Sequence, residues 1–141
     1  MEIKKYESRD EIPVKDTWAI EDLYENDEVW SAELETLAED TKLLASFEGK
    51  LGQDAQTLCN YLREMERVGC KAELLGSYCS RKSDQDTRNS AARAMVGRFR
   101  TLYTALGAAA SFETPEIMAI DDETLESFYV SAPVWSVTAG I

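Results

Sequence analysis

Apolar or small side chains recur at every third or fourth position through three long stretches of this chain, and this spacing restricts the fold more than any other feature. The first inner set, which follows residue 27, is Val29, Trp30, Leu34, Leu37, Thr41, Leu44 and Phe47. The second, which follows Asp54, is Leu58, Leu62, Met65, Gly69, Ala72, Leu75 and Cys79. The third, between Ser90 and Phe112, is Ala92, Met95, Phe99, Leu102, Leu106 and Ala109. Because a helix turns once in about 3.6 residues, each set lies on one helical face and predicts a long helix.

Short polar side chains indicate where these helices begin and end. Asp27 and Asp54 are suited to cap the first and second helices, and Gly49 suits the end of the first. The seven polar residues SDQDTRN, 83–89, separate the second helix from the third, which Asn89 or Ser90 can cap. A connection of this length makes the two helices antiparallel neighbours.

These features predict an all-α, up-and-down bundle of three long helices in residues 27–130, with a shorter C-terminal helix around Asp122 to Phe128. Residues 1–26 lack a helical period, and we expect an extended arm whose Trp18 and Tyr24 anchor it to the first helix. If Trp18 is buried there, its replacement by alanine costs about 3–5 kcal/mol. Residues 131–141 are atypical, and a truncated end, a frameshifted end and a strand pairing in an oligomer are all open.

The charge of the chain excludes several classes of partner. A formal net charge of −12 repels phosphate, so we expect neither nucleic-acid binding nor attraction to anionic membranes. No apolar run approaches the length of about 18 residues that a membrane span needs, and no signal peptide is evident, so a cytoplasmic location is expected. Cys59, Cys70 and Cys79 lack metal-binding spacing and are predicted to be buried, reduced thiols.

The sequence contains no histidine, which removes the commonest catalytic bases and zinc ligands. The polar turn is also a poor calcium loop. Counting from Asp84, Asn89 stands where such a loop needs glycine, and Met95 stands where it needs the closing glutamate. We therefore predict no catalytic residue and no metal ligand in this chain.

Charged residues are unevenly distributed along the chain. Ten acidic residues and no basic one lie between Lys15 and Lys42, whereas residues 81–100 carry six basic residues and two acidic ones. These faces can attract one another across the bundle, or the arginine-rich end can face a second domain or a peptide carboxylate. The candidate contact residues at that end are Asp84, Asp86, Arg88 and Arg93. As an alternative function, the acidic face around residues 16–40 suits a freestanding adaptor that binds a basic protein.

Four stretches resemble, in order and spacing, the start of oligoendopeptidase F proteins. The first is RDEIPVKDTWAIEDLYENDEVW, from Arg9 to Trp30. The second resembles an FxGKLG segment and comprises Phe47, Gly49, Lys50, Leu51 and Gly52. The third resembles a D-x-DT-x-N turn and comprises Asp84, Asp86, Thr87 and Asn89. The fourth resembles an F-x-x-PEI segment and comprises Phe112, Pro115, Glu116 and Ile117.

The resemblance implies the helical N-terminal lobe of a zinc metalloendopeptidase of the thimet-oligopeptidase type, which cuts short peptides in a channel between lobes. In that family an HExxH helix holds the zinc, far downstream of the matched region, so the expected partners are a missing catalytic lobe that carries the zinc and the short peptide substrates. The lobe itself forms a lid or wall of the channel and is inactive alone. A lobe without its partner exposes apolar surface, so homo-oligomers are also expected.

Overall fold

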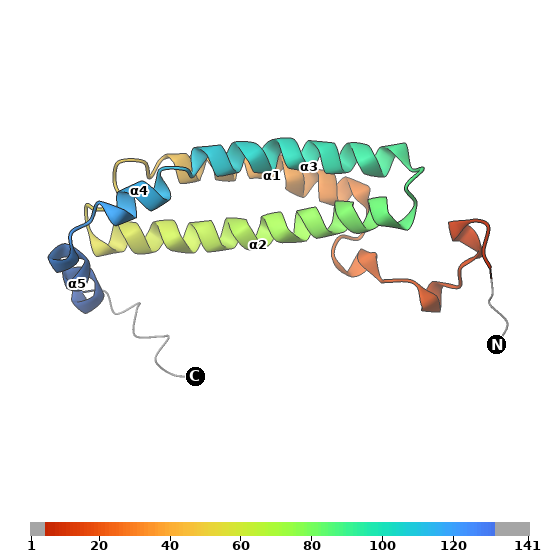
Figure 1. Ribbon diagram of the computed structural model, residues 1–141, viewed down its shortest axis with the longest axis horizontal. Coiled ribbons are helices and arrows are strands. Elements are labelled where there is room, and N and C mark those ends of the chain that lie inside the picture. Colours follow the sequence, from red (N-terminus) through yellow and green to blue (C-terminus); the bar gives the residue numbers. More distant parts are fainter. Residues whose placement is uncertain (1–4, 132–141) are drawn as a thin grey trace.

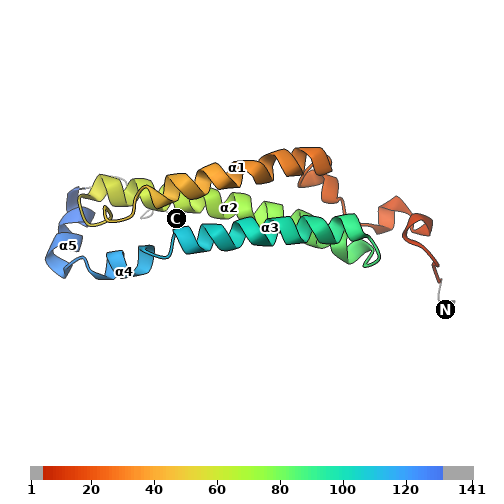
Figure 2. The same ribbon diagram turned by 90° about the horizontal axis from the view of Figure 1, so that it is seen from above.

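The computed structural model describes residues 5–131, and three long antiparallel helices form most of this part of the chain (Figure 1). The long helices are α1 (Asp27–Ala45), α2 (Ala55–Gln85) and α3 (Ser90–Ala109). Two short helices follow, α4 (Glu113–Met118) and α5 (Asp122–Ser131). Both views show α1 and α3 lying along α2, so the predicted all-α, up-and-down arrangement is confirmed (Figure 2). Residues 132–141, which include most of the atypical tail, lie outside the described residues.

Side-chain caps begin the three long helices. The Asn26 side chain accepts a hydrogen bond from the Val29 N–H at 2.9 Å, so the cap of α1 lies one residue before the predicted Asp27. Asp54 accepts from the Thr57 N–H at 2.8 Å, and this bond holds the pKa of the Asp54 carboxyl below its ordinary value. Asn89 accepts from the Ala92 N–H at 3.1 Å. The predicted caps at Asp54 and Asn89 are therefore confirmed.

Three helix ends differ from the prediction. The first helix ends at Ala45, before Phe47 and Gly49. The second helix continues through Gln85, because Ser83, Asp84 and Gln85 contain no helix breaker, and only residues 86–89 form the turn. The third helix ends at Ala109 and not near Phe112. Pro115 explains this end, because it lacks an N–H and its ring would clash with the carbonyl of Ser111 in a continuous helix.

The core lies between the three long helices and continues to α5. Its fully or nearly buried members are Trp30, Leu34, Leu37, Leu44, Leu51, Ala55, Leu58, Tyr61, Val68, Leu75, Tyr78, Cys79, Met95, Leu106, Phe112 and Phe128. Val29 is 45% exposed, so its predicted place on the inner stripe is wrong. Tyr61, Val68 and Tyr78 were missed, because α2 is covered on two sides and buries a wider face than one stripe.

Glycine and cysteine positions refine this description of α2. A methyl group on Gly76 would stand 2.9 Å from the Phe99 ring, so a glycine lets α3 approach closely here. Cys59 and Cys79 are buried thiols as predicted, but Cys70 is exposed, which contradicts the prediction for that residue. Cys70 lies on the face of α2 that neither neighbouring helix covers.

A charged cluster joins α1 to α2. Asp40 is nearly buried, and its two carboxylate oxygens accept from Arg67 Nη2 and from Lys71 Nζ, each at 2.6 Å. Lys71 also donates to the Thr36 hydroxyl at 2.8 Å. Burial by itself raises the pKa of Asp40, but the hydrogen bonds from Lys71 and Arg67 outweigh it and the pKa is lowered. The cluster therefore holds an ionised carboxylate at the helix contact.

The end of the bundle opposite the arm is closed by Glu116 of α4. Gly49, with a φ of +76°, turns the chain between α1 and α2 in a conformation that favours glycine. The Glu116 carboxylate accepts from the backbone N–H of Gly49 and, at 3.2 Å, from that of Leu51. Tyr61 donates to Glu113 at 2.7 Å, and burial together with this carboxylate raises the pKa of Tyr61. The second and fourth resembling segments thus meet in one structural junction.

The arm is coiled more than predicted and docks on a different helix. It contains three short 3-10 turns, η1 (Arg9–Glu11), η2 (Val14–Asp16) and η3 (Ile20–Asp22). Trp18 is 73% exposed and stacks with Arg81 of α2, so its predicted burial against the first helix is wrong. Tyr24 packs edge-on against Tyr78 of α2, with ring centroids 5.5 Å apart. The arm aromatics therefore contact α2.

The Asp40 cluster predicts a pH-dependent stability. Because the folded-state pKa of Asp40 is depressed, its contribution is present above its unfolded pKa, about 3.9, and is lost as the pH falls through the folded value. We expect Asp40→Asn to lower the free energy of unfolding by about 2 kcal/mol at pH 7, and by much less near pH 2. Urea unfolding at both pH values measures this. Glu39→Gln, which breaks only an exposed pair with Lys42, is the control and should change little.

The Glu116 junction predicts a second stability effect. Glu116→Gln keeps the size of the side chain but replaces one accepting oxygen with an amide donor, which cannot bond to a backbone N–H. We expect a loss of about 1–2 kcal/mol in urea unfolding. Glu126→Gln, the same change on an exposed residue of α5, serves as the matched control. Equal effects of the two variants would show that the junction does not stabilise the fold.

The two described tryptophans predict opposite outcomes for the same substitution. Trp30 is fully buried and its Nε1 donates to the Leu75 carbonyl at 2.9 Å, so Trp30→Ala should cost about 3–5 kcal/mol. Trp18 is exposed, so Trp18→Ala should cost less than about 1 kcal/mol. Thermal and urea unfolding of both variants distinguish the cases. A large loss for Trp18→Ala would mean that the arm contributes to the stability of the core.

Candidate functional site

The arm and the last turns of α2 form a pocket at the end of the bundle where the α2–α3 turn also lies (Figure 1). Its volume is about 300 Å³, and its lining residues are Arg9, Asp16, Thr17, Trp18, Ile20, Arg81, Asp84 and Gln85. Of the first five, Arg9, Asp16 and Ile20 lie in the 3-10 turns of the arm, and Thr17 and Trp18 lie between η2 and η3. The helical spacing of α2 places the last three on one face. The arm end therefore concentrates polar and aromatic groups from segments far apart in the sequence.

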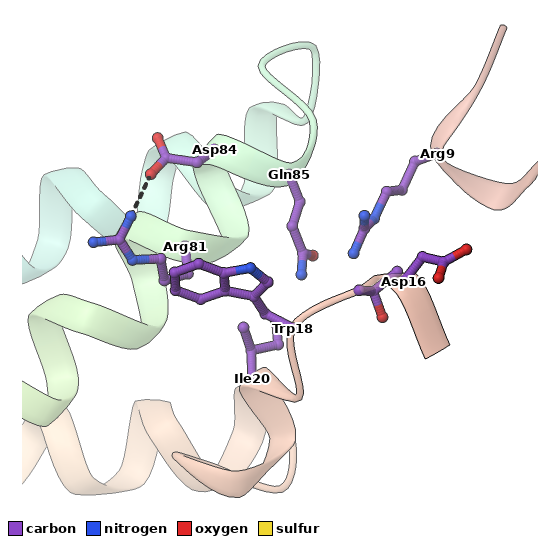
Figure 3. A pocket seen from close by; sticks show the side chains of 8 residues that line it. Arg9, Asp16, Trp18, Ile20, Arg81, Asp84 and Gln85 are labelled. Carbon is purple, nitrogen blue, oxygen red and sulfur yellow. Dashed lines mark hydrogen bonds and ion pairs between the residues drawn. The ribbon is translucent and has the colours of Figure 1, made fainter. Parts of the chain in front are cut away.

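Charges in this pocket are arranged asymmetrically (Figure 3). The Arg81 guanidinium carbon stands 5.6 Å from the Trp18 ring centroid, and its Nη1 lies 3.4 Å from Asp84 Oδ2. Figure 3 shows the Arg9 guanidinium and the Gln85 amide directed into the space beside the indole of Trp18. One arginine is thus engaged at the wall, whereas the other points into the cavity.

A neighbouring surface hollow contains a tyrosine and a carboxylate, and it is not equipped for acid–base catalysis. Tyr78 donates to Asp27 Oδ1 at 2.9 Å, and Lys82 Nζ binds the same oxygen. Burial first, and then Asp27, raise the pKa of Tyr78. Burial opposes ionisation of Asp27, but the bonds from Lys82 and Tyr78 lower its pKa. Tyr78 therefore stays protonated and Asp27 stays ionised, so this pair is suited to attach α1 to α2 and not to transfer protons.

The structure does not gather the four predicted contact residues into one site. Asp84 lines the arm pocket, while Asp86 and Arg88 pair with each other inside the turn, with Arg88 Nε 3.1 Å from Asp86 Oδ1. This pairing lowers the pKa of Asp86 and raises that of Arg88. Arg93, exposed on the first turns of α3, makes no side-chain hydrogen bond or ion pair with any residue of 5–131.

Six of the eight pocket residues were not predicted as contact residues, namely Arg9, Asp16, Thr17, Ile20, Arg81 and Gln85. Arg81 belongs to the basic stretch of residues 81–100. Arg9 lies more than seventy positions before Gln85, and only the path of the arm brings them together. A helical count back from Gln85 to Arg81 was the one available signal, because residues four apart share a helix face.

An apolar groove between α2 and α3 is a second candidate contact surface. Its volume is about 620 Å³, and it is lined by small and aromatic residues together with four polar ones: Gly69, Ala72, Glu73, Gly76, Ser77, Ser80, Arg81, Phe99 and Tyr103. Phe99 and Tyr103 stack with ring centroids 5.4 Å apart, and Tyr103 remains 53% exposed.

The residues present do not fit the zinc ion that the resemblance implies. The sequence has no histidine, and within residues 5–131 no group of three or more His, Cys, Asp or Glu side chains is placed to hold a metal. Over the same residues, no helix combines the length and apolar character that crossing a bilayer requires.

The chain is similar in sequence to known oligopeptidases. No protein-family profile matches the chain. The chain is 32% identical to oligopeptidase PepF of Bacillus subtilis (strain 168) over 120 residues, which are 85% of this chain and 18% of that protein. It is also 32% identical to the plasmid-encoded oligoendopeptidase F of Lactococcus lactis subsp. cremoris over 117 residues, 82% of this chain and 20% of that protein.

A solved structure shows the same fold. The crystal structure of oligoendopeptidase F from Enterococcus faecium superposes with a TM-score of 0.71 and 26% identity, over 81% of this chain and 22% of that one. The chain therefore spans about a fifth of the length of the relatives that it matches. In sequence and in fold, this chain is similar to one helical part of the oligoendopeptidase F proteins.

Proposed function

We propose that this chain serves as the non-catalytic, N-terminal helical lobe of an oligoendopeptidase F-like zinc metalloendopeptidase that hydrolyses short peptides. The observation that carries the proposal is the match, in sequence and in fold, to about one fifth of peptidases of this name. In this proposal the zinc and the hydrolytic groups belong to a separate catalytic lobe. The lack of histidine in the sequence, and of a group of metal ligands among residues 5–131, supports this assignment.

In this proposal the bundle provides a wall or lid of the substrate channel. The apolar groove between α2 and α3 is suited to contact the catalytic lobe, since it combines about 620 Å³ of space with the exposed ring of Tyr103. Arg93 lies on α3, as Tyr103 does, and its side chain makes no hydrogen bond or ion pair with residues 5–131. It can therefore pair with a carboxylate of that lobe. Arg88 is less suited, because Asp86 already engages it.

The adaptor alternative has weaker support from the structure. Five of the ten acidic residues between positions 16 and 40 make ion pairs within the bundle, namely Asp27, Glu33, Glu35, Glu39 and Asp40. Only the other five are left to meet a basic protein.

The proposal includes a cytoplasmic location, which the three free cysteines favour. Self-association of the chain stays a prediction.

Complementation tests the proposed function. The matching region is deleted from the Bacillus subtilis relative, and the remainder is mixed with this chain, zinc and a fluorescence-quenched peptide. We expect peptide cleavage at least tenfold above that of the remainder alone, and no cleavage by this chain alone. Arg93→Glu should weaken the gain severalfold through loss of an interlobe ion pair, whereas Arg63→Glu, an exposed arginine on α2, is the control.

Two outcomes contradict the proposal. Peptide cleavage by this chain alone would place catalytic groups within it. A folded chain that binds the remainder without raising cleavage would show that the lobe does not support the peptidase. Salt-sensitive capture of a basic test protein, with no effect on cleavage, would favour the adaptor instead.

A further inference from the structure

The arm pocket contains hydrogen-bond donors that the fold leaves without partners. Arg9 is half-buried, and none of the carboxylates in residues 5–131 lies within ion-pair distance of its guanidinium. The side chain of Gln85, also half-buried, makes no hydrogen bond with the described residues. The indole N–H of Trp18 is likewise unbonded within that part of the chain. Three donors therefore face one cavity of about 300 Å³.

The two carboxylates at the pocket leave this donor group unneutralised. Asp84 is engaged by Arg81, on the far side of the Trp18 ring from Arg9 (Figure 3). The Asp16 carboxylate is directed away from Arg9 and Gln85 in the same view. An unpaired, partly desolvated guanidinium is costly, and an anionic ligand would supply the missing acceptors.

We propose that this pocket binds a carboxylate group of a peptide. The planar fork of Arg9 matches the two oxygens of a carboxylate, the Gln85 amide is a second donor, and the Trp18 ring offers apolar contact to the adjoining residue. The volume lies at the lower end of the range for ligand sites and suits one residue of a peptide. A dianionic phosphate fits less well, because Asp16 and Asp84 lie nearby and the chain carries a net charge of −12.

This site is independent of the proposed peptidase function, since it can be measured on the chain by itself. The Trp18 indole resonance of the ¹⁵N-labelled 141-residue protein, assigned with Trp18→Phe, reports ligand binding directly. The probes are N-acetyl-Ala-Leu with a free C-terminus, the same dipeptide as its C-terminal amide, and amidated N-acetyl-Glu-Leu. We expect a saturable shift with at least one of the two carboxylate probes and none with amidated Ala-Leu.

The two carboxylate probes distinguish the source of the ligand. A shift with the free-acid dipeptide alone indicates a C-terminal carboxylate, and a shift with the amidated glutamate peptide indicates an acidic side chain. We expect Arg9→Gln to weaken binding roughly tenfold, the effect of one charge-assisted hydrogen bond. Lys15→Gln, which removes an exposed cation of the same arm outside the pocket lining, is the control and should bind as the parent does.

Equal binding of the neutral dipeptide, binding by neither carboxylate probe, or unchanged affinity of Arg9→Gln would each overturn the proposal. Circular dichroism and an unchanged Trp30 indole resonance confirm that the variants keep the bundle fold. Gln85→Ala provides a second variant that leaves the arm sequence intact, and it should also weaken binding. Failure of the complementation experiment has no bearing on these results.

Discussion

The three long helices depend on the packing around one side chain, Trp30 of α1. Its ring is fully buried, and its Nε1 donates to the Leu75 carbonyl of α2 at 2.9 Å. It stacks on Tyr78 with centroids 6.4 Å apart, and Arg98 of α3 lies 5.7 Å from its ring. One residue therefore combines apolar burial, a hydrogen bond and a cation–π contact with both neighbouring helices.

The two ends of the bundle differ in how completely their polar groups are satisfied. At one end Glu116 accepts two backbone N–H groups and Glu113 accepts the Tyr61 hydroxyl, so the junction is internally complete. At the other end the side chains of Arg9 and Gln85 make no hydrogen bond or ion pair with residues 5–131. Because buried and half-buried polar groups are costly when unpaired, the complete end serves stability and the incomplete end is suited to binding.

Much of the fold was accessible from local signals. The spacing of Leu34, Leu37 and Leu44 predicted the buried face of α1, and short polar side chains predicted the caps at Asp54 and Asn89. The errors came from contacts between segments. Val29 and Cys70 are exposed because helix rotation is decided by the neighbours that cover each face, and a spacing pattern leaves that rotation uncertain by one position.

The candidate site shows which contacts the sequence did not predict. The arginine-rich stretch contributes Arg81 to the pocket, but the turn residues Asp86 and Arg88 pair with each other, and the pocket also includes Arg9 of the arm. By itself the sequence determined the helical class, the helix order and the lack of histidine chemistry, because these depend on periodicity and composition. Only the tertiary structure decided that Trp18 stays exposed and stands beside Arg9, Arg81 and Gln85. The path of an arm without a helical period is set by its contacts with α2, and those contacts are not encoded in local spacing.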